Sequence, residues 1–134
     1  MLTPKGQKLK ANIKNNMGNF RNLDIWKQGI TIVKEVYKIS EQLPGEEKYG
    51  LRSQITRAAV SVPSNIAEGS SRNSEIEFKR FLEFAIGSLF ELETQFIIMK
   101  ELYLIDNKET KQLLALISEE QKMINGLINR IKKG

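Results

Sequence analysis

The feature that most restricts the fold is a run of apolar residues between positions 78 and 103, spaced alternately four and three residues apart. This spacing places one side chain on the same face of an α-helix at each turn, so it predicts a long helix with a continuous apolar seam. Ser74 and Glu77 form the S-x-x-E pattern of a capping box and predict where that helix begins. The seam residues are Phe78, Leu82, Ala85, Leu89, Leu92, Phe96, Met99 and Tyr103.

A first helix is predicted from about residue 23 to residue 43, where Pro44 and Gly45 end it. Its main apolar stripe is expected to be buried, and further apolar residues widen the helix beyond one seam. The stripe consists of Leu23, Trp26, Ile30, Val33 and Tyr37, and the widening residues are Ile25, Ile32, Val36 and Ile39.

The last helix is predicted to begin at Asp106, which acts as the N-cap with Glu109 three residues further on. No segment shows the alternation of a strand, and short connections between long helices favour antiparallel neighbours. The sequence therefore predicts an all-α, antiparallel up-down-up-down four-helix bundle over residues 20–134. A flexible basic N-terminal extension is expected over residues 1–19. The apolar stripe of the last helix is Leu113, Ile117, Ile124, Leu127 and Ile131.

The stretch SVPSNIAEGSSR, residues 61–72, places a proline within the second helix, which is predicted from about residue 49 to residue 68. One alternative makes Pro63 the first residue of a new helix, but only about six residues would then precede Gly69, too few for a stable helix. The apolar spacing also continues across the proline. We therefore expect one helix kinked at Pro63, whose ring leaves the carbonyl of Ala59 without its usual partner.

The residues that follow the proline are expected to serve packing and assembly. Asn65 is interpreted as a buried amide that fixes register, with an RNA or small-molecule ligand as the alternative. Glu68 lies where the helix dipole disfavours an acid, so Arg57, Arg72 or a basic group of another subunit is expected to offset its charge. Gly69 is interpreted as a left-handed C-cap.

The composition excludes several kinds of active site, because the chain has no histidine and no cysteine. The commonest general base, the commonest metal ligand and the Ser-His and Cys-His pairings are therefore absent. No apolar run is long enough to span a membrane, and the N-terminus does not read as a signal peptide. We expect a cytoplasmic, non-enzymatic protein with no cofactor, no metal and no membrane partner.

The net charge of +5 is unevenly distributed along the chain. Residues 1–16 carry +4, so residues 17–134 carry only +1. Residues 81–120 hold three basic and eight acidic residues, whereas residues 121–134 hold four basic residues and no acidic one. Such a bipolar surface suits self-assembly as readily as nucleic-acid binding. The candidate nucleic-acid-binding residues are Arg52, Arg57, Arg72, Lys79, Arg80, Arg130, Lys132 and Lys133.

The apolar residues exceed what the core of one bundle needs. On the third predicted helix, Phe81, Ile86, Phe90, Ile97 and Ile98 all lie off the main seam. A helix that is apolar most of the way round must be covered by something. The simplest cover for a four-helix monomer is another copy of itself, so the sequence predicts a symmetric homo-oligomer.

Three segments of the chain resemble the four-helix-bundle proteins that are encoded in intervening sequences of bacterial 23S ribosomal RNA genes. They are FRNLDIW (20–26), LRSQITRAAVSVPSNIAEGSSR (51–72) and EFKRFLEFAIGSLFELETQ (77–95). The resemblance covers residues 20–131, and VPSNIAEG followed by FLxxAxGSLxELET is its specific signature. It implies an antiparallel four-helix bundle that assembles as a homopentamer in a ring or barrel.

The resembled family is related to the accessory variability determinant of diversity-generating retroelements, which binds a reverse transcriptase and nucleic acid. The first functional expectation is therefore an oligomeric protein that binds RNA or DNA through the basic surface of a ring. The alternative is a protein-interaction scaffold without nucleic acid, which the near-neutral domain and the surplus apolar surface favour. The aromatic residues expected in core stripes, and so unavailable for stacking on bases, are Trp26, Tyr37, Phe78, Phe81 and Phe96.

Overall fold

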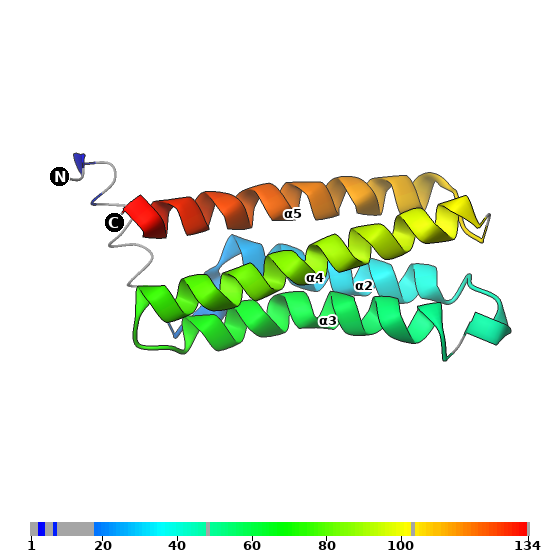
Figure 1. The fold of residues 1–134 in the computed structure, drawn as a ribbon, viewed down its shortest axis with the longest axis horizontal. Helices are drawn as coiled ribbons and strands as arrows, with labels where there is room; N and C mark the ends of the chain where they lie inside the picture. Colours follow the sequence, from blue (N-terminus) through cyan, green and yellow to red (C-terminus); the bar gives the residue numbers. More distant parts are fainter. Residues whose placement is uncertain (1–2, 5–6, 8–17, 48, 103, 134) are drawn as a thin grey trace.

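The computed structural model describes residues 3–4, 7, 18–47, 49–102 and 104–133, and within these ranges it is all-helical, with no strand. The all-α prediction is confirmed. The predicted N-terminal extension lies largely outside the described residues. Two short 3-10 helices, η1 (Phe20–Asn22) and η2 (Gly45–Glu47), accompany four long helices (Figure 1): α2 (Asp24–Ser40), α3 (Leu51–Ser70), α4 (Glu75–Glu101) and α5 (Lys108–Lys133).

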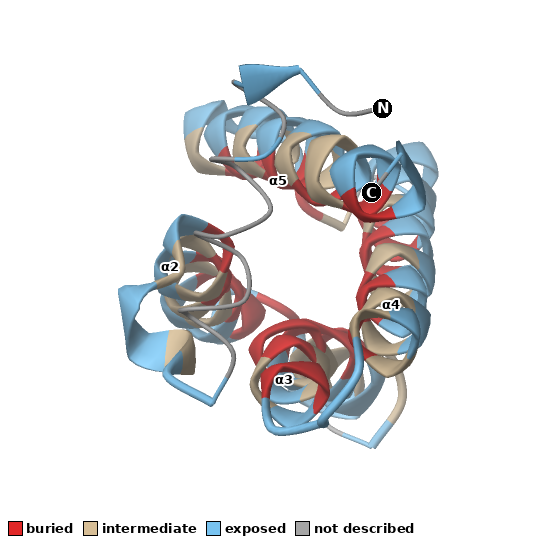
Figure 2. Ribbon diagram, turned by 90° about the vertical axis from the view of Figure 1, so that its left-hand side faces the viewer, coloured by how far each residue is buried: buried red, intermediate tan, exposed pale blue. Residues whose placement is uncertain are grey.

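The four long helices surround one core. Helices that are consecutive in the chain pack against each other, and α2 also packs against α5, so each helix has two neighbours. Figure 2 looks along the bundle and shows the buried residues of every helix turned toward the shared interior. The described part of the α4 seam lies there as predicted. Its buried residues are Phe78, Leu82, Ala85, Leu89, Leu92, Phe96 and Met99.

The buried face of α2 differs from the prediction. Tyr37, which ends the expected stripe, is 49% exposed, and Trp26 is only half-buried. The core of the bundle lies between the neighbours of α2, which are α3 and α5, so the face that points between them is the buried one. The residues thought only to widen the stripe therefore form its centre. The buried residues of α2 are Ile25, Gly29, Ile32, Val36, Ile39 and Ser40.

The capping predictions are confirmed for α4 and wrong for α5. The Ser74 hydroxyl accepts a hydrogen bond from the backbone N–H of Glu77 at 3.1 Å, as expected for an N-cap. Before α5, Asn107 takes the place predicted for Asp106. Its side-chain oxygen accepts from the Thr110 N–H at 3.0 Å, and the Thr110 hydroxyl accepts from the Asn107 N–H at 3.1 Å. This reciprocal pair satisfies two backbone donors, so the helix begins one residue later than predicted.

Helix α3 passes through Pro63 without a break, as the continuous apolar spacing predicts. The role predicted for Gly69 is wrong, because this glycine lies inside the helix and is buried. Gly18 is the glycine with a positive φ among the described residues. A Cβ on Gly69 would lie 2.6 Å from the Cβ of Phe81 and 3.1 Å from Cδ1 of Phe78. A glycine is therefore needed here so that α3 and α4 can approach closely.

Candidate functional site

An aromatic and basic cluster covers the corner where α3 leads into α4. The Arg72 guanidinium lies over the ring of Phe81, 4.9 Å from its centroid, and pairs with the Glu68 carboxylate at 3.1 Å. The predicted offset of the Glu68 charge is thus provided by Arg72. The Arg80 guanidinium lies 5.6 Å from the centroid of Phe84, and the two phenylalanine rings meet edge to face at 5.6 Å. We call Arg72, Arg80, Phe81 and Phe84 the corner cluster.

The corner cluster joins two basic residues predicted as binding candidates to two aromatic residues that were not. Phe84 is 47% exposed and Phe81 is half-buried, so part of each ring is accessible. The spacing of Arg80 and Phe84, four residues apart on a helix, is the sequence signal that could have revealed this pair. Lys79 lies beside the cluster and pairs with Glu83 at 3.4 Å, which partly neutralises it.

The remaining basic candidates separate into different environments. The Arg52 guanidinium donates to the carbonyls of Ser40 and Leu43 at 3.0 and 2.9 Å, so it is committed to holding the end of α2. Arg57 is exposed on α3, further along the same helix. These two residues do not join the corner cluster. Arg52 therefore has a structural role that the sequence reasoning did not foresee.

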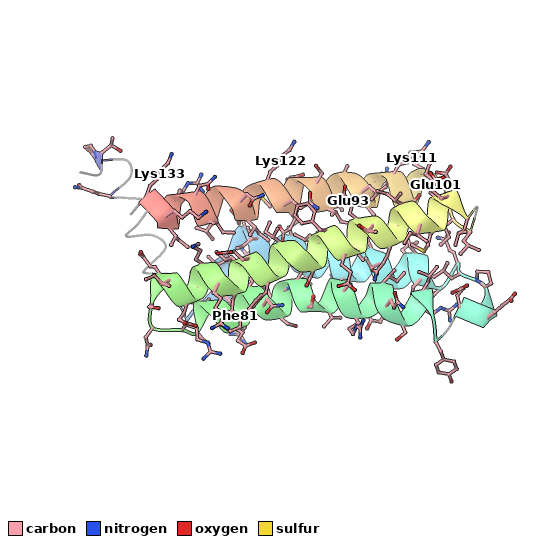
Figure 3. All side chains as sticks on the ribbon, in the orientation of Figure 1. Phe81, Glu93, Glu101, Lys111, Lys122 and Lys133 are labelled. Carbon is pink, nitrogen blue, oxygen red and sulfur yellow. The ribbon has the colours of Figure 1, made fainter. Side chains whose placement is uncertain are left out.

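The last turn of α5 carries Arg130, Lys132 and Lys133, all exposed. Within the part of the chain that the structure describes, no ion pair engages any of the three. Figure 3 places Lys133 at the same end of the bundle as Phe81, because α5 ends where α3 gives way to α4. Two separate stretches of sequence therefore bring their basic residues to one end of the molecule.

The residues around Pro63 are engaged in internal contacts. The Asn65 side chain donates to the carbonyl of Ser61 at 2.8 Å within the same helix and is half-buried. The hydroxyl of Ser61 donates to the carbonyl of Ala58 at 2.8 Å and also hydrogen-bonds to the hydroxyl of Ser88 on α4. Pro63 itself is buried. These contacts favour the interpretation of this stretch as a packing element over a ligand site.

A buried carboxyl group in α5 was missed by the sequence reasoning. Glu120 is fully buried, and neither of its oxygens has a hydrogen-bond partner among the described residues. Its burial, with a smaller contribution from the charge of Glu119, raises its pKa from 4.5 to about 8. The group is therefore mostly protonated at neutral pH. The charge that acts on it belongs to Glu119, the next residue along the helix, which is exposed.

Two apolar surfaces remain uncovered. The first, the α4 row, comprises side chains of α4 and of its C-cap that are 41–59% exposed. The second, the α2–α3 groove, is a shallow open depression of about 250 Å³. Large exposed apolar patches mark interaction sites. The α4 row is Phe84, Phe90, Ile97, Ile98 and Leu102. The groove is lined by Trp26, Ile30, Val33, Val60, Pro63, Ser64 and Ala67.

Two other kinds of site can be assessed over the described ranges. There, no group of three or more carboxylates or other metal-ligating side chains is placed to hold a metal ion. No helix in the same ranges is both long and apolar enough to cross a membrane. The fold and its surfaces thus define a helical bundle with a basic, aromatic corner and uncovered apolar faces.

The chain belongs to the 23S rRNA-intervening sequence protein family, whose model matches residues 21–126. A crystal structure from Bacteroides thetaiotaomicron has a similar fold, with a TM-score of 0.72 and 19% sequence identity. It is described as a protein of unknown function from the S23 ribosomal protein family, and the similarity covers 78% of this chain and 97% of that one. No curated protein matches the chain. The family expected from the three segments is confirmed.

Proposed function

We propose that this protein is a non-enzymatic, cytoplasmic homo-oligomer, a ring-like pentamer by family resemblance, that binds RNA through basic surface repeated around the ring. Each subunit is an antiparallel up-down-up-down bundle with α3 kinked at Pro63. The course of the colours in Figure 1 supports the antiparallel arrangement, since successive helices run back and forth along the long axis. The buried proline within α3 supports the kink.

The observation that carries self-association is the α4 row. Phe90 is 54% exposed and Phe84 is 47% exposed, on the face of α4 turned away from the core. Burying apolar surface contributes about 25 cal/mol per Å², so covering several such side chains provides a substantial driving force. A second copy supplies apolar surface of the same kind without any other partner.

RNA association is supported by where the basic residues lie. Arg72 and Arg80 of the corner cluster and the last turn of α5 occupy one end of the bundle. In a ring, every subunit would present this end in the same orientation, so a modest charge per subunit becomes an extended basic surface. The half-buried ring of Phe81 adds aromatic surface of the kind that stacks on unpaired bases.

The test compares two triple variants on the same helix. Arg130, Lys132 and Lys133 are replaced by alanine in one, and Lys108, Lys111 and Lys122, which are exposed elsewhere on α5, in the other. Binding of a labelled RNA hairpin is measured by fluorescence anisotropy across a salt series. We expect the first variant to lose about 2 to 3 from the slope of log affinity against log salt, since each phosphate contact contributes ~0.9. Equal loss in both variants would contradict a localised basic surface.

The alternative function is a protein-interaction scaffold that binds no nucleic acid, which the same α4 row favours. Native mass spectrometry of the purified protein, with and without nuclease, separates the two functions. An oligomer that retains nuclease-sensitive mass supports RNA association. An oligomer with no such mass, and with no salt-dependent affinity for the hairpin, supports the scaffold. A monomer at micromolar concentration would contradict self-association itself.

A further inference from the structure

The α4 row has a shape that suits insertion into a groove. Gly87 lies on the exposed face of α4, and a Cβ built there would meet nothing within 4 Å. A glycine inside a helix costs about 1 kcal/mol relative to alanine. No neighbour among the described residues accounts for the free-energy cost of this glycine. Its position therefore indicates close approach by a helix of another molecule. Phe84 and Phe90 project on either side of it, three residues away in each direction.

The α2–α3 groove has the complementary shape. Its α3 wall is built from small side chains, Ser64 and Ala67, with Val60 39% exposed beside them. Its α2 wall carries Trp26, whose side chain is only half-buried. At 1.5 Å per residue, the α2 wall from Trp26 to Val33 runs for about 10 Å, and the part of the α4 row from Phe84 to Phe90 spans about 9 Å. The groove is therefore long enough to take Phe84 and Phe90, the first two residues of the row.

The charges beside the two surfaces have opposite signs. Lys34 and Lys38 on α2 and Arg57 on α3 are exposed beside the groove, and the acid Glu68 at its α3 end is paired with Arg72. Along the row, α4 exposes three acids, Glu83, Glu91 and Glu101, and two bases, Arg80 and Lys100, so acids outnumber bases there. Two α4 rows facing each other would bring like charges together, which is unfavourable, whereas a row facing the groove would bring opposite charges together.

We propose that the α4 row of one subunit packs into the α2–α3 groove of a second copy of this chain. The contact joins two different surfaces, so it is heterologous and each subunit keeps one free row and one free groove until a ring closes. This inference rests on the self-association proposed above and specifies which faces meet. Phe84 and Phe90 would fill the groove on either side of Gly87.

The native chain has no cysteine, so engineered pairs report this contact without background. The double variant Val60→Cys, Phe90→Cys carries one thiol in the groove and one in the row. After mild oxidation, we expect a denaturing, non-reducing gel to show a covalent ladder extending beyond the dimer, because every interface gains one disulfide. The control is Val60→Cys with Lys122→Cys, whose second thiol is on the outer face of α5, and we expect it to remain unlinked (Figure 3).

The single variants complete the test. If Phe90→Cys alone forms a disulfide-linked dimer as efficiently as the double variant forms its ladder, two rows face each other and the pairing proposed here is wrong. An oligomer by native mass spectrometry in which the double variant forms no disulfide also overturns the pairing, while leaving self-association intact. A monomeric wild-type protein would instead contradict the proposed function.

Charge reversal gives a second readout that does not depend on a thiol. Glu91→Lys is expected to weaken subunit association about tenfold, because it places a base opposite the basic edges of the groove. Adding Lys34→Glu to the same chain is expected to restore association. Circular dichroism checks that both variants remain helical. If the double variant associates no better than Glu91→Lys alone, these two charges do not face each other and the proposed pairing is refuted.

Discussion

Glu120 of α5 and Gly29 of α2 meet in the centre of the bundle, where Oε2 of the glutamate lies 3.4 Å from the position that a Cβ on Gly29 would occupy. The ring of Pro63 on α3 lies at the same distance from that position, through its Cβ. A glycine, a proline and a buried acid are each unfavourable inside a helix or a core. The three residues meet at one point, where the small size of Gly29 leaves space beside the carboxyl group and the proline ring.

The first prediction concerns the pH dependence of stability. Because burial raises the pKa of Glu120 from 4.5 to about 8, the unfolded chain releases this proton before the folded chain does. The contribution of the group is therefore fully favourable below about pH 4.5 and is lost as the pH rises toward 8, at about 1.4 kcal/mol per pH unit. Glu120→Gln should remove this slope, which urea denaturation at several pH values would measure.

The control for the Glu120 prediction is Glu119→Gln, a change at an exposed neighbour. It removes the smaller of the two causes of the pKa shift, so the decline should keep its slope and end at a slightly lower pH. If Glu120→Gln retained the wild-type decline in unfolding free energy between pH 5 and pH 8 (about 1.4 kcal/mol per unit), the buried carboxyl would not be its source.

The second prediction concerns the close approach of α3 and α4. Gly69→Ala should lower the free energy of unfolding by about 1 to 3 kcal/mol, because the new methyl group would overlap Phe81 and crowd Phe78. Gly126→Ala is the matched control, since its Cβ would meet the Arg130 side chain at an ordinary 3.8 Å. Thermal denaturation of the two variants measures the difference. Equal melting temperatures would show that the α3–α4 contact relaxes freely.

The third prediction concerns Arg52. Arg52→Lys should lower the free energy of unfolding by about 1.5 to 3 kcal/mol, because one ammonium group does not reproduce the forked donation to the Ser40 and Leu43 carbonyls. Arg57→Lys, at an exposed position of the same helix, should leave stability almost unchanged. RNA affinity should be unaffected by Arg52→Lys at temperatures where the variant is folded. A loss of affinity there would return Arg52 to the binding surface.

The fourth prediction concerns Pro63. Pro63→Ala restores the N–H that the ring lacks, so the kink proposed for α3 should be relieved and the lining of the α2–α3 groove should shift. We expect subunit association to weaken while the helical content is kept, as judged by native mass spectrometry and circular dichroism. Unchanged assembly combined with lost RNA binding would show that this residue serves the RNA surface instead.

The long helices and their apolar faces could be predicted from the sequence because they depend on apolar residues that recur at a regular spacing. The seam from Phe78 to Met99 is buried as expected, since every turn of α4 repeats the same signal. On α2 two apolar stripes compete, and only the positions of α3 and α5 decide that Ile32 faces the core and Tyr37 does not. A periodic pattern identifies each apolar face of a helix, but it does not show which of two such faces is buried in the core.

Details that depend on a single contact between distant residues could not be read in this way. Glu120 is buried beside Gly29, which is far away in the chain. The structural role of Arg52 depends on the position of the Leu43 carbonyl, which accepts a hydrogen bond from its guanidinium. The basic end of the molecule arises because α5 ends beside the α3–α4 corner, which only the path of the chain determines.

The α4 row also bears on how the protein persists after synthesis. A subunit with Phe90 and Ile97 facing water resembles the partly opened states that proteases and chaperones recognise. The self-association proposed here would hide these side chains and, by mass action, would add stability that grows with the amount of protein made. Chains produced in small numbers would then be removed quickly, whereas chains produced together would protect one another. In such an assembly, the exposed row would couple the lifetime of the protein to its own abundance.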